Sequence, residues 1–176
     1  MLFAKIRILY RVIRDYFRYS HEAELFGFAI GFNSFVNREK DLHILMLDYD
    51  MQDFDPVEQS VTELIDFWNL SDAYVYSTNK GYHVLFYFDI MPYSRVRMII
   101  SYARDVDPLY KMISKFYDHK TIRAAGKYKK HDIALYKVIR GIRTPTLKEL
   151  ELGELKKMEH DKLFSLHTML NKEGLK

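Results

Sequence analysis

The chain of 176 residues contains no cysteine, which excludes disulfide bonds, cysteine-ligated zinc and thiol catalysis. Proline and glycine are scarce, with four and seven residues, and no low-complexity linker divides the chain. Long apolar runs are missing too: four arginines interrupt segment 1–20, which therefore lacks the continuous apolar core of a signal peptide or a membrane span. We expect one soluble, unprocessed, cytoplasmic domain over residues 1–176, without a membrane partner.

The mild net charge of +3 hides a segregation of charge along the chain. Segment 41–72 has nine carboxylates and no Lys or Arg, whereas segment 111–148 has eleven Lys or Arg and two Asp. A nucleotide-handling enzyme needs an acidic region that holds divalent cations beside a basic region that holds phosphates. Two ordinary solvated surfaces would give the same pattern, so charge alone leaves both interpretations open.

The spacing of apolar residues predicts helices at about 1–19, from Asp55-Pro56 to about 68, at 94–117 and at 147–172. The third helix is expected to break near Asp107-Pro108, because proline disfavours helical geometry in the preceding residue. Short apolar and aromatic runs predict adjacent strands at 26–32 and 43–50, a hairpin from 73–78 and 82–88, and strands at 121–128 and 132–139. This order predicts an α+β fold with helices on one face of a mainly antiparallel sheet.

One pair of aspartates stands out by its position. The pattern Asp-x-Asp occurs at 48/50, 53/55 and 105/107. Only Asp48 and Asp50 close a strongly apolar strand, and the strand period of two aims both carboxylates to the same side. Two such carboxylates repel each other unless a cation lies between them. They would suit two Mg²⁺ or Mn²⁺ ions about 4 Å apart, although a solvated acidic strand end is the alternative.

A second group of polar residues surrounds the predicted hairpin turn. Gly81 lets backbone amides approach an anion closely, and the hydroxyls of Ser77 and Thr78 can donate to phosphate oxygens. Lys80 and His83 add two further donors. A plain hairpin turn with a half-buried histidine would explain the glycine but not the clustering of these donors. The segment is therefore a candidate site for a nucleotide's phosphates.

A third group lies in the basic part of the chain. Asp118 would supply another carboxylate, Arg123 a bidentate phosphate ligand and Lys127 a point charge. A helix-ending aspartate and a basic strand facing water would explain the same residues taken singly. A nucleic-acid strand would then follow the rest of the basic block, at Lys129, Lys130, Lys137, Arg140 and Arg143.

In this order the three segments resemble the three sequence motifs of the archaeo-eukaryotic primase superfamily. The family has a strand ending in Asp-x-Asp, then a Ser/Thr-x-x-Gly-x-His hairpin, and later an Asp before an Arg-containing strand. The segments 47–50 and 78–83 match the first two motifs closely. The third match is looser, because the family's Asp usually lies further before its Arg, so Asp107 and Asp132 are alternatives to Asp118. The resemblance covers about residues 26–143 and leaves the terminal helices out.

The resemblance implies an RRM-like palm that joins NTP or dNTP on a single-stranded DNA template or a primer-template. It implies that Asp48, Asp50 and Asp118 bind the two Mg²⁺ or Mn²⁺ ions, and that the hairpin and Arg123 hold the triphosphate. Many relatives start strands with a cysteine-ligated zinc element that this chain lacks, so a helicase or a second primase subunit is a candidate partner.

Two other functions compete with this interpretation. A replication-initiator nickase needs a paired His-x-His or a close equivalent, and the seven histidines of this chain form no such pair. A non-catalytic nucleic-acid-binding protein of the same fold would gain nothing from Asp48 and Asp50 near phosphates.

Overall fold

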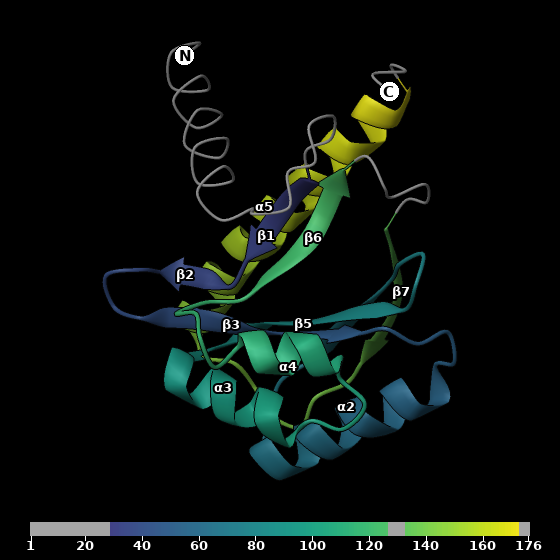
Figure 1. Ribbon diagram of the computed structural model, residues 1–176. Helices are drawn as coiled ribbons and strands as arrows, with labels where there is room; N and C mark the ends of the chain where they lie inside the picture. The colour runs from purple at the N-terminus through teal and green to yellow at the C-terminus, as the bar shows by residue number, and fades with distance from the viewer. Residues whose placement is uncertain (1–28, 127–132, 173–176) are drawn as a thin grey trace.

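The computed structural model describes residues 29–126 and 133–172 of the chain. Its main sheet has five antiparallel strands in the order β2-β3-β5-β4-β7 (Figure 1). These strands are β2 (Phe35–Asn37), β3 (Leu42–Tyr49), β4 (Ala73–Ser77), β5 (Tyr82–Pro92) and β7 (Ala134–Ile139). A separate two-stranded sheet pairs β1 (Ala29–Asn33) with β6 (Thr121–Gly126). The α+β class and the antiparallel sheet predicted from the sequence are confirmed.

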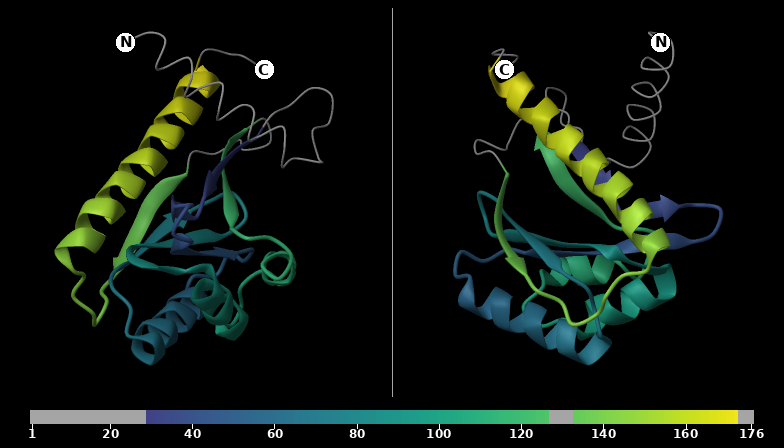
Figure 2. Two further views of the ribbon diagram at one scale, coloured as in Figure 1. Left: turned by 90° about the vertical axis from the view of Figure 1, so that its left-hand side faces the viewer. Right: turned by 180° about the vertical axis from the view of Figure 1, so that it is seen from behind.

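Four helices lie within the described residues: α2 (Asp55–Trp68), α3 (Tyr93–Tyr102), α4 (Pro108–Ile113) and α5 (Leu147–Lys172). The first three lie on one side of the main sheet, whereas α5 and the β1–β6 pair lie on the other (Figures 1 and 2). The prediction that helices cover a single face is therefore wrong. Strand β5 shows why, because seven consecutive residues, 83–89, are buried, and a strand buried on both faces needs cover on both.

Alternation along the strands sends side chains to these two layers. On one face the Tyr49 hydroxyl lies 3.1 Å from the Ser60 hydroxyl of α2. On the other face the Tyr87 hydroxyl lies 2.6 Å from Nδ1 of His160 in α5. Both tyrosines belong to the buried hydrophobic core, and full burial of one large apolar side chain contributes about 1.5–3 kcal/mol.

Most predicted elements are present in the described residues. The β4–β5 hairpin, the break between α3 and α4, and the strands β6 and β7 are confirmed. No described helix combines the length and the hydropathy that crossing a membrane would require. The helix predicted at 1–19 lies outside the described residues.

The strand pairing of the N-terminal part differs from the prediction. Strand β1 pairs with β6, and the short β2 takes the place beside β3. The chain changes sheets at Ser34, whose amide donates to the Lys120 carbonyl (2.8 Å) and whose carbonyl accepts from the Ile44 amide (2.9 Å). Strand β1, before Ser34, therefore belongs to a different sheet from strand β2, after it.

Strand β3 extends well beyond its short partner β2, and the segment around α4 seals the part of this edge that β2 leaves open. The Tyr110 hydroxyl donates to the Met46 carbonyl (2.8 Å), and the Asp107 amide donates to the Asp48 carbonyl (2.9 Å). Covering an exposed edge in this way prevents pairing with other chains. It also fixes Asp107 next to the acidic end of β3.

Candidate functional site

The site is built around the last residues of β3. Asp48 pairs in register with His83 of β5, and His83 Nε2 lies 3.5 Å from an Asp48 carboxylate oxygen. Tyr49, the residue between the two aspartates, points into the core towards Ser60. The Asp48 side chain is 37% exposed, and Asp50 is exposed just beyond the strand. The first two predicted motifs therefore meet at one end of the sheet.

Gly81 explains how the hairpin comes so close to this strand end. A Cβ atom at this position would lie 1.9 Å from the Tyr49 carbonyl oxygen and 2.7 Å from the Met51 amide nitrogen, so only glycine fits there. Thr78 shapes the turn, because its hydroxyl oxygen accepts the amides of Lys80 (3.3 Å) and Gly81 (3.1 Å). The hydroxyl proton of Thr78 can still be donated to a ligand, and Lys80 is exposed.

The loop after the acidic pair is also fastened to the hairpin. Gln52 Nε2 donates to the Asn79 carbonyl at 3.1 Å. The ring of Phe54 lies 5.1 Å from that of Tyr82 and 4.8 Å from that of Tyr136, measured between centroids. These contacts join the loop, β5 and β7, and they hold the exposed carboxylates in place beside the turn.

Asp107 lies at this end of the sheet as well. Besides its backbone bond to Asp48, its carboxylate accepts the Tyr110 amide at 2.5 Å and so caps α4. The Asp107 side chain as a whole is half-buried. Asp107 was one of the two alternatives for the third acidic ligand, and the structure places it beside Asp48.

A buried lysine, Lys120, completes the charge pattern. Its Nζ donates to the Tyr110 carbonyl (2.5 Å) and lies 3.6 Å from the centre of the Tyr110 ring. Burial lowers the pKa of Lys120 to about 8, against the opposing effect of the Asp48 and Asp107 carboxylates. The lysine therefore offsets part of the repulsion between these carboxylates. No sequence pattern singles it out, because it is one cation in a basic stretch.

Asp118, the residue predicted as third ligand, lies elsewhere. Its side chain is 81% exposed and lies 2.6 Å from His119 Nδ1. The hydrogen bond from His119 lowers the pKa of Asp118. Asp118 also acts electrostatically on His43, which precedes Asp48 by five residues, or about 16 Å along a strand. The structure therefore brings Asp107, and not Asp118, to the acidic pair.

Another polar cluster occupies the opposite end of β3. Ser34 Oγ lies 2.9 Å from His43 Nδ1, and His43 Nε2 lies 3.1 Å from an Asp41 oxygen. The connectivity is that of a hydrolase triad. Ser34 is fully buried and accepts the Lys120 amide, while Asp41 also accepts the Tyr93 amide. A substrate cannot reach this serine, so the cluster is structural.

Two predicted nucleic-acid ligands are paired with carboxylates. Lys137 Nζ lies 2.6 Å from a Glu58 oxygen, and Arg140 lies 2.6 Å from an Asp72 oxygen. Both cations are exposed, and surface pairs of this kind contribute at most about 1 kcal/mol. Lys137 and Arg140 can therefore turn towards another anion at little cost.

Arg143 has a different role. Its guanidinium contacts the buried Asp89 (2.9 Å), Glu149 (2.9 Å) and the Phe88 carbonyl (2.7 Å). Asp89 is 2% exposed and also accepts the amide and hydroxyl of Ser71. Removing one partner of such a pair leaves an uncompensated buried charge. Arg143 is thus a structural residue, which argues against the predicted contact with nucleic acid.

The remaining predicted ligands are placed only in part. Ser77 ends β4 and its hydroxyl donates to the Ala134 carbonyl of β7 at 3.4 Å. The backbone of Arg123 lies in β6, opposite Gly31. Four further residues fall outside the described part of the chain: Lys127, Lys129, Lys130 and Asp132.

The donor set suits a cation that is shared with a substrate. Within residues 29–126 and 133–172, no group of three or more His, Asp or Glu side chains could hold a metal ion by itself. Asp48 and Asp50 nevertheless offer two carboxylates. Mg²⁺ is commonly bound by one or two carboxylates together with water and substrate phosphates. The residues therefore fit an ion that arrives with a nucleotide.

Comparisons with known proteins give no match: neither a family model, nor a curated protein, nor a solved structure is similar to this chain.

Proposed function

We propose that the chain is a template-dependent nucleotidyltransferase of the primase-polymerase type, with an RRM-like palm of the archaeo-eukaryotic primase kind. One observation carries the proposal. Asp48 is the register partner of His83, and Gly81 packs against the backbone on either side of Asp50. The two sequence segments that match the family motifs most closely are thus in direct contact, although about 30 residues separate them.

Asp48 and Asp50 would hold the divalent cations, two Mg²⁺ or Mn²⁺ ions, and Asp107, which caps α4, would add negative charge near them. When bound, the cations would neutralise charge on the phosphates and favour ionisation of the attacking hydroxyl. Lys80 and the amides of the turn would hold the triphosphate of an NTP or dNTP. His83 would orient the Asp48 carboxylate, since the His83 ring is buried and its Nε2 lies 3.5 Å from an Asp48 oxygen.

In the reaction the 3′-hydroxyl oxygen of a primer strand, paired with a single-stranded DNA template, attacks the α-phosphorus in line. A new P–O bond forms, the bond to pyrophosphate breaks, and the hydroxyl proton passes to solvent. The protein's contribution is to position the groups and to compensate their charge. A helicase or a second primase subunit would supply the exposed template.

The test is extension of a labelled primer on a DNA template with Mg²⁺ or Mn²⁺ and either dNTP or NTP, with template-only reactions in parallel. We expect template-dependent products from the natural chain, and a loss of roughly 10³-fold in rate for Asp48→Asn/Asp50→Asn. The matched control is Asp53→Asn/Asp55→Asn, which removes the same charge from the neighbouring Asp-x-Asp pair. Both of these residues are exposed, and the control should retain at least half of the rate.

The proposal fails if the natural chain makes no product in any of these mixtures, or if the control loses as much activity as the Asp48/Asp50 variant. Cleavage of single-stranded DNA with a covalent tyrosyl adduct would favour the replication-initiator nickases instead.

A further inference from the structure

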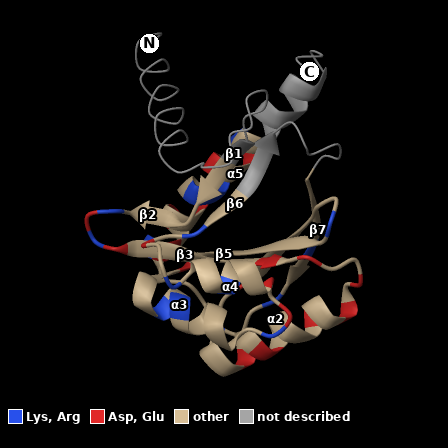
Figure 3. Ribbon diagram, in the orientation of Figure 1, with Lys and Arg blue, Asp and Glu red and all other residues tan. Residues whose placement is uncertain are grey.

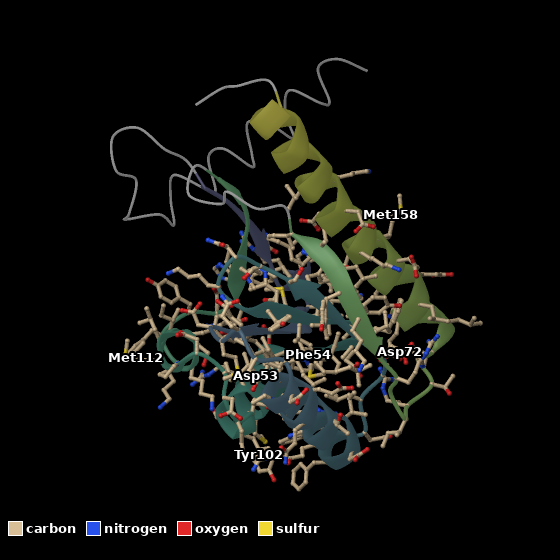
Figure 4. The ribbon with its side chains drawn as sticks, turned by 90° about the vertical axis from the view of Figure 1, so that its right-hand side faces the viewer. Asp53, Phe54, Asp72, Tyr102, Met112 and Met158 are labelled. Atoms are coloured by element: carbon tan, nitrogen blue, oxygen red, sulfur yellow. The ribbon has the colours of Figure 1, made fainter. Side chains whose placement is uncertain are left out.

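An unusual concentration of apolar side chains is exposed on α4 and the turn that follows it. The exposed fraction is 77% for Phe116 and 51% for Tyr117. Leu109, Met112 and Ile113 are exposed as well, and Figure 4 shows Met112 pointing outwards. Exposed apolar groups that gather on one short segment mark binding surfaces more often than scattered ones do. We call residues 108–117 the α4 platform.

The backbone of the α4 platform is firmly anchored, so the exposure of these side chains is not caused by a loose segment. Tyr110 is buried and its hydroxyl reaches the Met46 carbonyl. Ser114 is buried, and the Tyr93 hydroxyl donates to its carbonyl at 3.3 Å. Lys120 Nζ holds the Tyr110 carbonyl from the other side. The platform therefore presents its outer side chains from a fixed frame.

The charges around the α4 platform favour a polyanion. Lys111 and Lys115 alternate with its apolar residues, and Arg97 lies close enough to act electrostatically on Tyr93 beneath it. The platform is bounded in the sequence by Asp107, whose carboxylate caps α4, and by Asp118, which is paired with His119. Aromatic faces interleaved with cations are the combination that binds single-stranded nucleic acids.

A second exposed aromatic pair provides a contrast. Phe67 and Tyr102 are 63% and 55% exposed, and their rings stack with centroids 4.7 Å apart. Glu63 and Asp66 flank this pair on α2, where acidic residues concentrate (Figure 3). Its rings already contact each other. Of the two neighbouring carboxylates, Asp66 adds negative charge and Glu63 is paired with Arg104, so we expect weaker binding of nucleic acid here than at the platform.

The α4 platform is also continuous with the candidate site. It follows Asp107, whose amide is bonded to the Asp48 carbonyl. Phe116 comes nine residues after Asp107: the six residues of α4 span about 9 Å, and the three beyond it can add at most about 10 Å. At about 3.4 Å per nucleotide in a stacked strand, this upper bound corresponds to roughly six nucleotides.

We propose that the α4 platform binds a single strand of nucleic acid by stacking bases on Phe116 and Tyr117, and leads that strand to Asp48. The binding itself does not depend on catalysis; only the statement that the strand continues to Asp48 rests on the proposed function.

The test measures the affinity of the full chain for a fluorescein-labelled oligo(dT) of about 20 nucleotides by fluorescence anisotropy. Phe116→Ala/Tyr117→Ala should raise the Kd by roughly 10- to 100-fold, because stacking on one aromatic ring is commonly this strong. Phe116→Leu/Tyr117→Leu, which keeps the apolar surface but removes the rings, should show most of the same loss. Lys115→Gln should reduce the slope of log Kd against log salt by about one.

Phe67→Ala/Tyr102→Ala is the matched control, and it should leave the Kd within about twofold of the natural chain's, a small change for a surface without contacts to the ligand. An unchanged Kd for both platform variants would overturn the proposal, and so would an equal loss in the control. If the platform variants instead change the oligomeric state by light scattering at constant DNA affinity, the surface is a protein interface and the proposal is wrong. If DNA binding depends on the platform but the chain has no polymerase activity, the proposed binding surface is supported and the proposed polymerase function is wrong.

Discussion

The two ends of strand β3 carry the same residue types and use them differently. At the first end, His43 shares its two ring nitrogens between Ser34 and Asp41, and the second oxygen of Asp41 accepts the Tyr93 amide. At the last end, His83 meets Asp48 at a longer distance of 3.5 Å. A pairing of His with Asp therefore does not by itself distinguish a binding site from a structural one.

The balance of charge separates the two ends. Asp50 follows Asp48 by two residues, the Asp107 backbone is bonded to the Asp48 carbonyl, and one buried ammonium, that of Lys120, interacts with the Asp48 and Asp107 carboxylates. A remaining negative charge in a partly exposed position favours a bound cation. At the His43 end each carboxylate has a histidine within 3.1 Å. The excess of carboxylates is thus the feature that marks the candidate site.

The largest effect that would test this comparison comes from removing one carboxylate charge at each end of β3. Asp107→Asn keeps the cap of α4, because asparagine caps helices as well as aspartate does, but removes a negative charge beside Asp48. We expect primer extension to slow by roughly 10²-fold, as for the loss of one preorganised charge. Asp118→Asn, at the other end, should leave the rate within about twofold. Steady-state extension rates of the two variants measure the difference.

Thermal unfolding of both variants serves as the control for this pair, because similar melting temperatures show that the rates refer to folded protein. The opposite order of activities, with Asp118→Asn the slower enzyme, would show that the third carboxylate has been assigned to the wrong end of β3.

The second effect tests the claim that the Ser34 cluster is structural. Ser34→Ala removes the partner of His43 Nδ1 and of the Lys120 amide, and a buried polar group left without its partner costs about 1–3 kcal/mol. Urea unfolding should show a loss of this size in the free energy of unfolding. Ser101→Ala is the control: Ser101 is exposed and its hydroxyl donates to the Arg97 carbonyl of the same helix, so the change should stay within about 0.5 kcal/mol. Hydrolytic activity that disappears with Ser34 would contradict a purely structural role.

Local signals in the sequence predicted much of this architecture. Asp55-Pro56 marked the start of α2, Asp107-Pro108 separated α3 from α4, and Asn79-Lys80-Gly81 marked the β4–β5 turn. Each of these signals acts on a few neighbouring residues through backbone geometry, so it can be found without knowledge of the tertiary fold. They do not account for the meeting of the first two motifs, which depends on the pairing of β3 with β5.

Contacts between distant segments could not be predicted in this way. The change of sheets at Ser34 depends on Lys120, which is 86 residues away. The choice of Asp107 over Asp118 depends on a backbone bond to the open edge of β3. The burial of Lys120 depends on Tyr110 and Ser34 together. None of these leaves a periodic or motif-like trace, because each is a single contact made by the packed tertiary structure.

The smallest effect is a pH dependence below neutral pH that comes from the His43 end. Burial is the main cause that lowers the pKa of His43 below 6.5, and it is opposed by Asp41 and Asp118 and supported by His119. Below pH 6.5 the unfolded chain therefore binds a proton that the folded chain does not. The stabilisation by neutral His43 is complete above pH 6.5 and is lost as the pH falls towards the folded-state pKa. Asp118 has a pKa lowered from 3.8 and affects stability only at lower pH.

The free energy of unfolding of the natural chain should thus decrease between pH 7 and pH 5, as measured by urea unfolding at several pH values. In His43→Gln, which keeps a hydrogen-bonding side chain but has no proton to bind, the curve should be lower at pH 7 and flatter over this range. If the slope persists unchanged in this variant, the pH dependence comes from another group. The two ends of β3 would then not differ in the way proposed, with a neutral, buried histidine at one end and a carboxylate-rich site at the other.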